Sequence, residues 1–170
     1  MRRLVWLTVL AIALAVPAVG LALSGNDDGT LSVKGGIGKV YLNFNGSAVG
    51  RVAKGSIKVI DPNPDDGLGF SFSGCDVGSH DISDTATICR GSNLRFRAIG
   101  GKYIVVMSGP AGIGSGIYLS AVGHGYAVLN GAGDDSSIFT DGTYSVNDGL
   151  YKSLPDIARP VTLAAPSGGG

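Results

Sequence analysis

The sequence predicts an all-β protein, either an antiparallel sandwich or a barrel-like fold. The 170 residues include 29 Gly but no Glu and no Gln, so all 13 acidic residues are Asp. Glu and Gln favour helices, whereas Gly and Asp favour turns. From residue 30 onward, short segments in which apolar and polar residues alternate are separated by Gly-rich turns. This spacing is typical of an all-β domain.

The N-terminal segment over positions 1–24, MRRLVWLTVLAIALAVPAVGLALS, is typical of a signal peptide. Two Arg residues near the start precede an apolar run over residues 4–16, which Pro17 ends. Small side chains allow cleavage after Gly20 or after Ser24. An uncleaved anchor is the alternative, because apolar residues continue past Pro17 nearly to Leu23 and a membrane-spanning helix needs about 20 residues. We therefore expect a secreted or cell-envelope protein that contacts a membrane only through this segment, if at all.

Strand signals follow one another through the rest of the chain. In KVYLNFN (39–45), Val40, Leu42 and Phe44 alternate with polar residues, and Asn45-Gly46 then predicts a hairpin turn. Further strands are expected over residues 56–60, 85–89, 93–99, 102–107, 116–122 and 126–130, with a final hairpin over 143–154. We expect a single β domain over residues 25–160 and a flexible tail over 161–170.

One phrase of the sequence occurs twice. GKVYLNFNGSAVG (38–50) returns later in the chain, in altered form, as GKYIVVMSGPAGI (101–113). The matched residues include Leu31 with Leu94, Lys34 with Arg97 and Leu42 with Val105. We interpret the repeat as an internal duplication of a β unit, over about 30–91 and 92–155, with two related sheets packed on each other.

The two cysteines are expected to form a disulfide. Cys75 and Cys89 are the only cysteines in the sequence, and disulfides persist in extracytoplasmic compartments. Two buried free thiols are the alternative. A metal pair is disfavoured, because His80 and His124 are the only histidines that could complete a site.

Charge and motifs exclude several function classes. Without the signal peptide, 11 basic residues stand against 13 acidic ones, so bulk attraction to nucleic acid is not expected. The absence of Glu excludes an HExxH zinc helix and a Glu-based glycosidase. A small secreted hydrolase using His80 or His124 with Ser and Asp is the alternative function, since a triad assembles in space rather than in sequence.

Two segments are candidate ligand sites. DPNPDDG places Asp61, Asn63 and Asp65 at alternate positions, which resembles the start of a calcium-binding loop. The same residue types also build ordinary turns. Arg95 and Arg97 alternate with apolar residues and therefore share one face, which Lys34 and Lys102 could extend; such a patch suits an anionic cell-wall polymer. The alternative is a charged face that keeps the sheet soluble. No cofactor other than calcium is expected.

The phrases NLRFRAIGG, VLNGAG and DGTYSVNDGLYKSLP resemble those of uncharacterised exported, glycine-rich β proteins of high-GC bacteria. The resemblance covers about residues 83–155. It implies export and assigns no functional residue. The sequence therefore favours an exported, non-enzymatic β domain that acts as a structural or binding module at the cell surface or envelope, with an envelope polymer or a surface protein as its partner.

Overall fold

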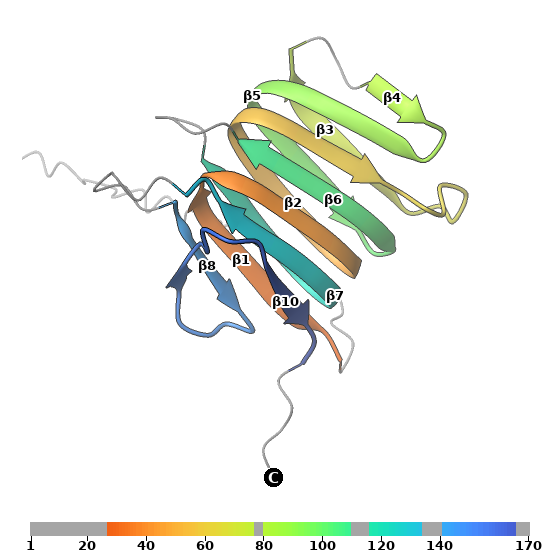
Figure 1. The fold of residues 1–170 in the computed structure, drawn as a ribbon. Coiled ribbons are helices and arrows are strands. Elements are labelled where there is room, and N and C mark those ends of the chain that lie inside the picture. Colours follow the sequence, from red (N-terminus) through yellow and green to blue (C-terminus); the bar gives the residue numbers. More distant parts are fainter. Residues whose placement is uncertain (1–26, 77–79, 110–115, 134–140, 166–170) are drawn as a thin grey trace, which may run out of the picture.

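Ten β-strands and no helix make up the part of the chain that the computed structural model describes, which is residues 27–76, 80–109, 116–133 and 141–165. The strands are β1 (Gly29–Gly36), β2 (Gly38–Ile60), β3 (Gly69–Cys75), β4 (His80–Ser83), β5 (Ala86–Ile99), β6 (Lys102–Gly109), β7 (Ile117–Gly131), β8 (Thr143–Val146), β9 (Lys152–Ser153) and β10 (Arg159–Leu163). They form one curved antiparallel sheet that is not closed into a barrel (Figure 1). The all-β prediction is confirmed.

The sheet folds back on itself because β2, β5 and β7 are long enough to take part in two layers. The β6 layer runs in the order β10, β7, β2, β6, β2, β5, β4 and uses residues 38–45 and 56–60 of β2 on the two sides of β6. The β1 layer runs in the order β3, β5, β2, β7, β1, β8, β9 and uses the middle of β2. The two layers face each other as in a sandwich.

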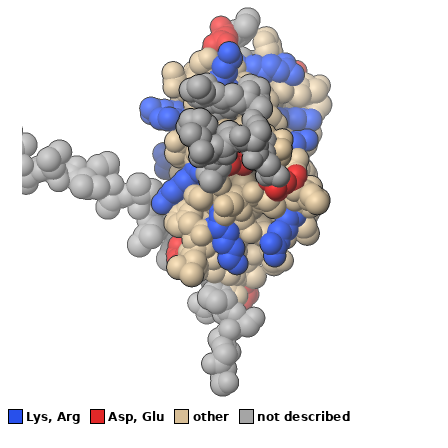
Figure 2. All heavy atoms as spheres, turned by 60° about the vertical axis from the view of Figure 1, so that its left-hand side comes forward, with Lys and Arg blue, Asp and Glu red and all other residues tan. Residues whose placement is uncertain are grey.

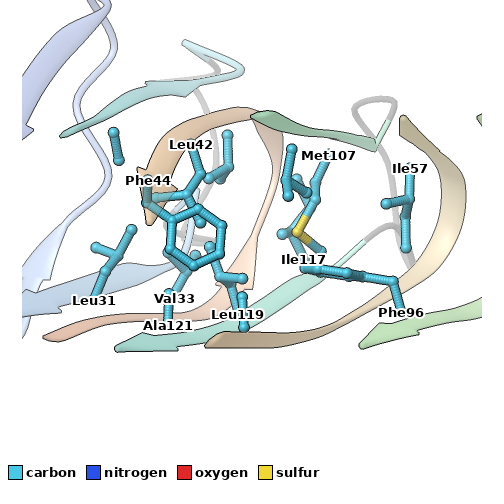
Figure 3. Close-up of a cluster of buried hydrophobic side chains, with 14 of the residues drawn as sticks. Leu31, Val33, Leu42, Phe44, Ile57, Phe96, Met107, Ile117, Leu119 and Ala121 are labelled. Carbon is cyan, nitrogen blue, oxygen red and sulfur yellow. The ribbon is translucent and has the colours of Figure 1, made fainter. Parts of the chain in front are cut away.

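The hydrophobic core lies between the two layers. Leu42, Phe44 and Met107 enter it from the β6 layer, and Leu31 and Leu119 enter it from the β1 layer. Figure 3 shows these side chains meeting between strands above and below them. Each is at most 4% exposed. The alternation that predicted the strands is thus the alternation between core and outer face.

The predicted hairpin turn at Asn45-Gly46 is wrong, because β2 continues through it. Gly46 has φ +155° and pairs with Gly123 of β7, which has φ +154°. Neither residue carries a Cβ, so the two strands can bend together here. The bend takes β2 from the β6 layer into the β1 layer, and β2 returns near Gly55, which pairs with Gly91 of β5.

The strand pairing relates the two matched sequence segments by an approximate two-fold axis. Leu42 lies directly opposite Val105, the residue that the sequence aligned with it. In the β1 layer the pairing is reciprocal, because a strand of each segment pairs with a strand of the other. Leu31 on β1 lies opposite Ala121 on β7, and its match Leu94 on β5 lies opposite Val52 on β2. Each segment contributes strands to both layers, so the prediction that each forms a sheet of its own is wrong. An internal duplication remains our interpretation of this arrangement.

The C-terminal part extends the sheet at two places. β8 and β9 pair as the predicted final hairpin, and Asn147 and Asp148 in its turn have φ +52° and +53°. β10 pairs with β7 as far as Leu163, past the expected start of the tail. Among the described residues there is no apolar helix of membrane-spanning length. The predicted signal peptide and its cleavage points lie outside the described residues.

Candidate ligand-binding groove

The outer face of the β1 layer is hollowed into an open groove of about 580 Å³. Residues from β3, β5, β2, β7 and β1, in this spatial order, line it. The lining residues are Ser32, Val33, Lys34, Val49, Gly50, Arg51, Ser71, Phe72, Ser73, Arg95, Phe96, Arg97, Tyr118, Leu119 and Ser120. Val33, Phe96 and Leu119 belong to the core and, with Gly50, form the floor of the groove. The other described lining residues include basic, hydroxyl and aromatic side chains, and no carboxylate is among them.

The polar lining residues form two rows across the strands. In the first row, Ser73, Arg95, Arg51 and Tyr118 lie opposite one another on β3, β5, β2 and β7. In the second row, the order is Ser71, Arg97, Val49, Ser120 and Ser32, which reaches β1. Each row crosses the groove at right angles to the strands.

Arg51 and Arg95 are the central feature of the groove. They occupy directly opposed positions on β2 and β5, and both are exposed. Like charges in this arrangement destabilise a sheet. Within the described residues, no acidic side chain makes an ion pair with Arg51, Arg95 or Arg97. As far as the described residues show, the positive charge of the groove is therefore not balanced by ion pairs.

Aromatic rings hold two of the basic side chains in place. The guanidinium carbon of Arg51 lies 5.1 Å from the centroid of the Tyr118 ring, and Nζ of Lys34 lies 4.0 Å from that of Tyr151. These are cation–π contacts. The Tyr151 hydroxyl also lies 2.9 Å from Oγ of Ser32. Hydrogen bonding by Lys34 and then by Ser32 lowers the pKa of Tyr151.

Positive and negative charges occupy different parts of the fold. All the described basic residues lie in strands: Lys34, Lys39, Arg51, Lys54, Lys58, Arg90, Arg95, Arg97, Lys102, Lys152 and Arg159. Of the described Asp residues, only Asp81 lies in a strand. In the view of Figure 2, more basic than acidic side chains are visible around the grey residues. The described strands thus carry mainly basic charged residues, although the formal net charge of the chain is zero.

The predicted basic patch is only partly brought together. Arg95, Arg97 and Lys34 line the groove, whereas Lys102 begins β6 in the other layer. Sequence analysis missed Arg51, because the turn expected at Asn45-Gly46 interrupted the strand that carries it. If the alternation of β2 is continued past Gly46, Arg51 falls on the outer face between Gly50 and Val52.

The three predicted calcium ligands lie in the loop between β2 and β3. The Asp61 carboxylate is buried, and its Oδ1 accepts a hydrogen bond from the backbone N–H of Asn63 at 3.0 Å. Asn63 and Asp65 are exposed. No group of three His, Cys or acidic side chains in the described residues is arranged to hold a metal ion. The calcium site therefore stays a prediction.

Both histidines are exposed on strands and neither lines the groove. Nδ1 of His124 lies 3.2 Å from Oδ1 of Asp28. Asp81, the neighbour of His80, instead accepts a hydrogen bond from Oγ1 of Thr87 at 2.7 Å. Within the described part of the chain, no Ser or Cys side chain hydrogen-bonds to either histidine, so the contact that a hydrolase triad needs is not formed there.

Cys75 and Cys89 form the predicted disulfide, with their Cα atoms 5.3 Å apart. Cys75 ends β3 in the β1 layer, and Cys89 lies in the first part of β5, opposite Ile57 in the β6 layer. The bond therefore ties β3 to β5 at the point where β5 passes from one layer to the other.

A second hollow, of about 450 Å³, lies on the outer face of the β6 layer. It is lined by Lys39, Tyr41, Tyr126, Val128, Asn130 and Ala158. The two tyrosine rings are tilted by 32°, with their centroids 5.9 Å apart. Hydrogen bonds from Tyr41 and then Asn43 lower the pKa of Tyr126, whereas burial and then the contact with Tyr126 raise the pKa of Tyr41. Among the described residues, Lys39 is the one basic residue that lines this second hollow, so the groove is the better candidate for an anionic ligand.

Comparison with protein-family models, with curated proteins and with solved structures finds no match for this chain.

Proposed function

We propose that this chain is an exported, non-enzymatic β domain that binds an anionic polymer of the cell envelope through the groove. The observation that carries the proposal is the direct opposition of Arg51 and Arg95 in a hollow whose described lining residues include no carboxylate. This arrangement costs stability in the free protein. A bound phosphate or carboxylate group between the two guanidinium groups removes the repulsion and accepts charge-assisted hydrogen bonds.

Two further observations support a binding role at the envelope. Four serine hydroxyls and Tyr118 accompany the basic residues, so neutral parts of a polymer such as sugar hydroxyls also find partners. The signal-peptide-like start predicts export, and the disulfide is consistent with an extracytoplasmic location.

The test is binding of the purified protein to immobilised polyphosphate and polygalacturonate, with dextran as a neutral polymer of similar size. We expect retention on one or both polyanions and none on dextran. The double variant Arg51→Gln/Arg95→Gln should lose retention. The matched control is Arg90→Gln/Lys102→Gln, which removes the same charge from the β6 layer, outside the groove. Equal losses in the two double variants would mean that net charge, and not the groove, binds the polymer.

A further inference from the structure

The floor of the groove lies on the approximate two-fold axis of the fold. Gly50 and Leu119 line the groove and are directly opposite each other on β2 and β7. On either side of them, Ala48 pairs with Ala121 and Val52 pairs with Ile117. Ala48 on β2 and Ile117 on β7 differ by 69 in residue number, and so do Val52 and Ala121. A two-fold rotation about the Gly50–Leu119 pair therefore exchanges these two pairs.

The same rotation exchanges the two ends of the groove. The flanking strands β1 and β5 are related by the alignment of the two repeated phrases, which places Lys34 in correspondence with Arg97 and Ser32 with Arg95. One end of the groove therefore carries Lys34 and the equivalent position at the other end carries Arg97. Positive charge is kept at both ends, although the side chains differ.

The two ends are too far apart for one small anion. Two strands, β2 and β7, lie between β5 and β1, so Arg97 and Lys34 are separated by three inter-strand steps of about 4.8 Å each. Arg97 belongs to the second row, which ends at Ser32 on β1, and Lys34 lies two residues further along β1 from Ser32. Together these steps place the two positions about 16 Å apart.

Resting on the proposed function, we infer that the groove consists of two half-sites, one at Lys34 and one at Arg97, which hold successive anionic groups of one linear polymer. Arg95 lies two residues from Arg97 on β5, and Arg51 lies opposite Arg95 on β2, on the way to Lys34. These two residues bind the intervening part of the polymer. A polymer that reaches both half-sites gains from the high effective concentration of its second group. A single phosphate or a very short chain does not have this gain.

The inference is tested by isothermal titration calorimetry, in which the full protein is titrated with inorganic phosphate, with tripolyphosphate and with long-chain polyphosphate. Long-chain polyphosphate should bind at least about 100-fold more tightly than tripolyphosphate. Lys34→Gln and Arg97→Gln should each remove most of this difference, while each changes tripolyphosphate affinity only about twofold. Lys102→Gln, outside the groove, should leave both affinities unchanged.

The outcomes separate the inference from the proposed function. If long-chain polyphosphate binds tightly and either single variant keeps the full length dependence, the two half-sites do not exist, although the groove still binds polyanions. If only one of the two variants has an effect, the groove has a single site. If neither polyphosphate nor an oligogalacturonate series of the same lengths binds at all, the proposed function itself fails.

Discussion

Gly46 and Gly123 face each other where β2 and β7 bend together, and a Cβ on either would overlap a carbonyl oxygen of the other strand, that of Val122 or of Asn45. We therefore expect Gly46→Ala to lower the free energy of unfolding by about 3 kcal/mol, through backbone strain and this overlap. Gly67→Ala is the matched control, because Gly67 also has positive φ but has no atom near its absent side chain. Urea denaturation measures both. Equal losses would show that the overlap with Val122 adds nothing to the strain of a side chain at positive φ.

Removal of the disulfide should destabilise the fold. Cys75 and Cys89 are 14 residues apart in sequence, and a bond that closes a loop of this size contributes about 3 kcal/mol in the chain-entropy model. Cys75→Ala/Cys89→Ala should lower the urea midpoint of unfolding, and reductant should lower that of the wild type but not that of the variant. A wild-type midpoint that is insensitive to reductant would contradict the prediction.

Tyr103 should be replaceable by Phe without loss of stability. Its ring is buried beside Phe44, and its hydroxyl has no hydrogen-bond partner within the described residues. A buried, unsatisfied polar group costs about 1–3 kcal/mol, so Tyr103→Phe should raise the free energy of unfolding by about 1 kcal/mol. A loss of stability would show that the hydroxyl has a partner in solution.

The same residue should make stability depend on alkaline pH. Burial, followed by the charges of Asp61 and Asp66, raises the pKa of Tyr103 above its ordinary value of 10.0. The folded state therefore holds the proton more firmly than the unfolded state, and stability falls as pH rises from about 10 through the pKa in the folded state. Denaturant titrations between neutral and strongly alkaline pH should show a smaller loss in Tyr103→Phe than in the wild type.

Asp61 should stabilise the loop between β2 and β3 with or without calcium. Its buried carboxylate accepts the N–H of Asn63, so Asp61→Ala should cost about 1 kcal/mol. Melting curves in millimolar calcium and in chelator test the predicted ion site. A calcium-dependent rise in Tm that Asp61→Ala abolishes would establish it. An unchanged Tm would mean that the three residues form a turn only.

Arg95→Ser should stabilise the free protein slightly. The substitution places at position 95 the residue that occupies the equivalent position in β1, Ser32, and removes the repulsion with Arg51. We expect a gain of about 0.5 kcal/mol at low ionic strength, which should shrink as added salt screens the charges. A gain that is independent of salt would point to a cause other than charge.

The all-β class and the disulfide could be predicted because they depend on composition and on local alternation. The path of β2 could not, because its bend depends on Gly123, which is distant in the sequence, and Asn45-Gly46 by itself has the chemistry of a turn. The error at this one position also hid Arg51 and with it half of the central pair of the groove. The shared face of Arg95 and Arg97 could be predicted, because apolar and polar residues alternate around them without interruption.

The reciprocal pairing of the two matched segments has a consequence for when the chain can fold during synthesis. β2 pairs with β5, β6 and β7, and β1 pairs with β7 and β8. Among the described residues, neither of the first two strands therefore finds a strand partner until later parts of the chain have been made. Contacts so distant in sequence also form slowly. The emerging chain should therefore remain unfolded until most of it has been translated, which is the state that a protein needs in order to be threaded through a translocation channel.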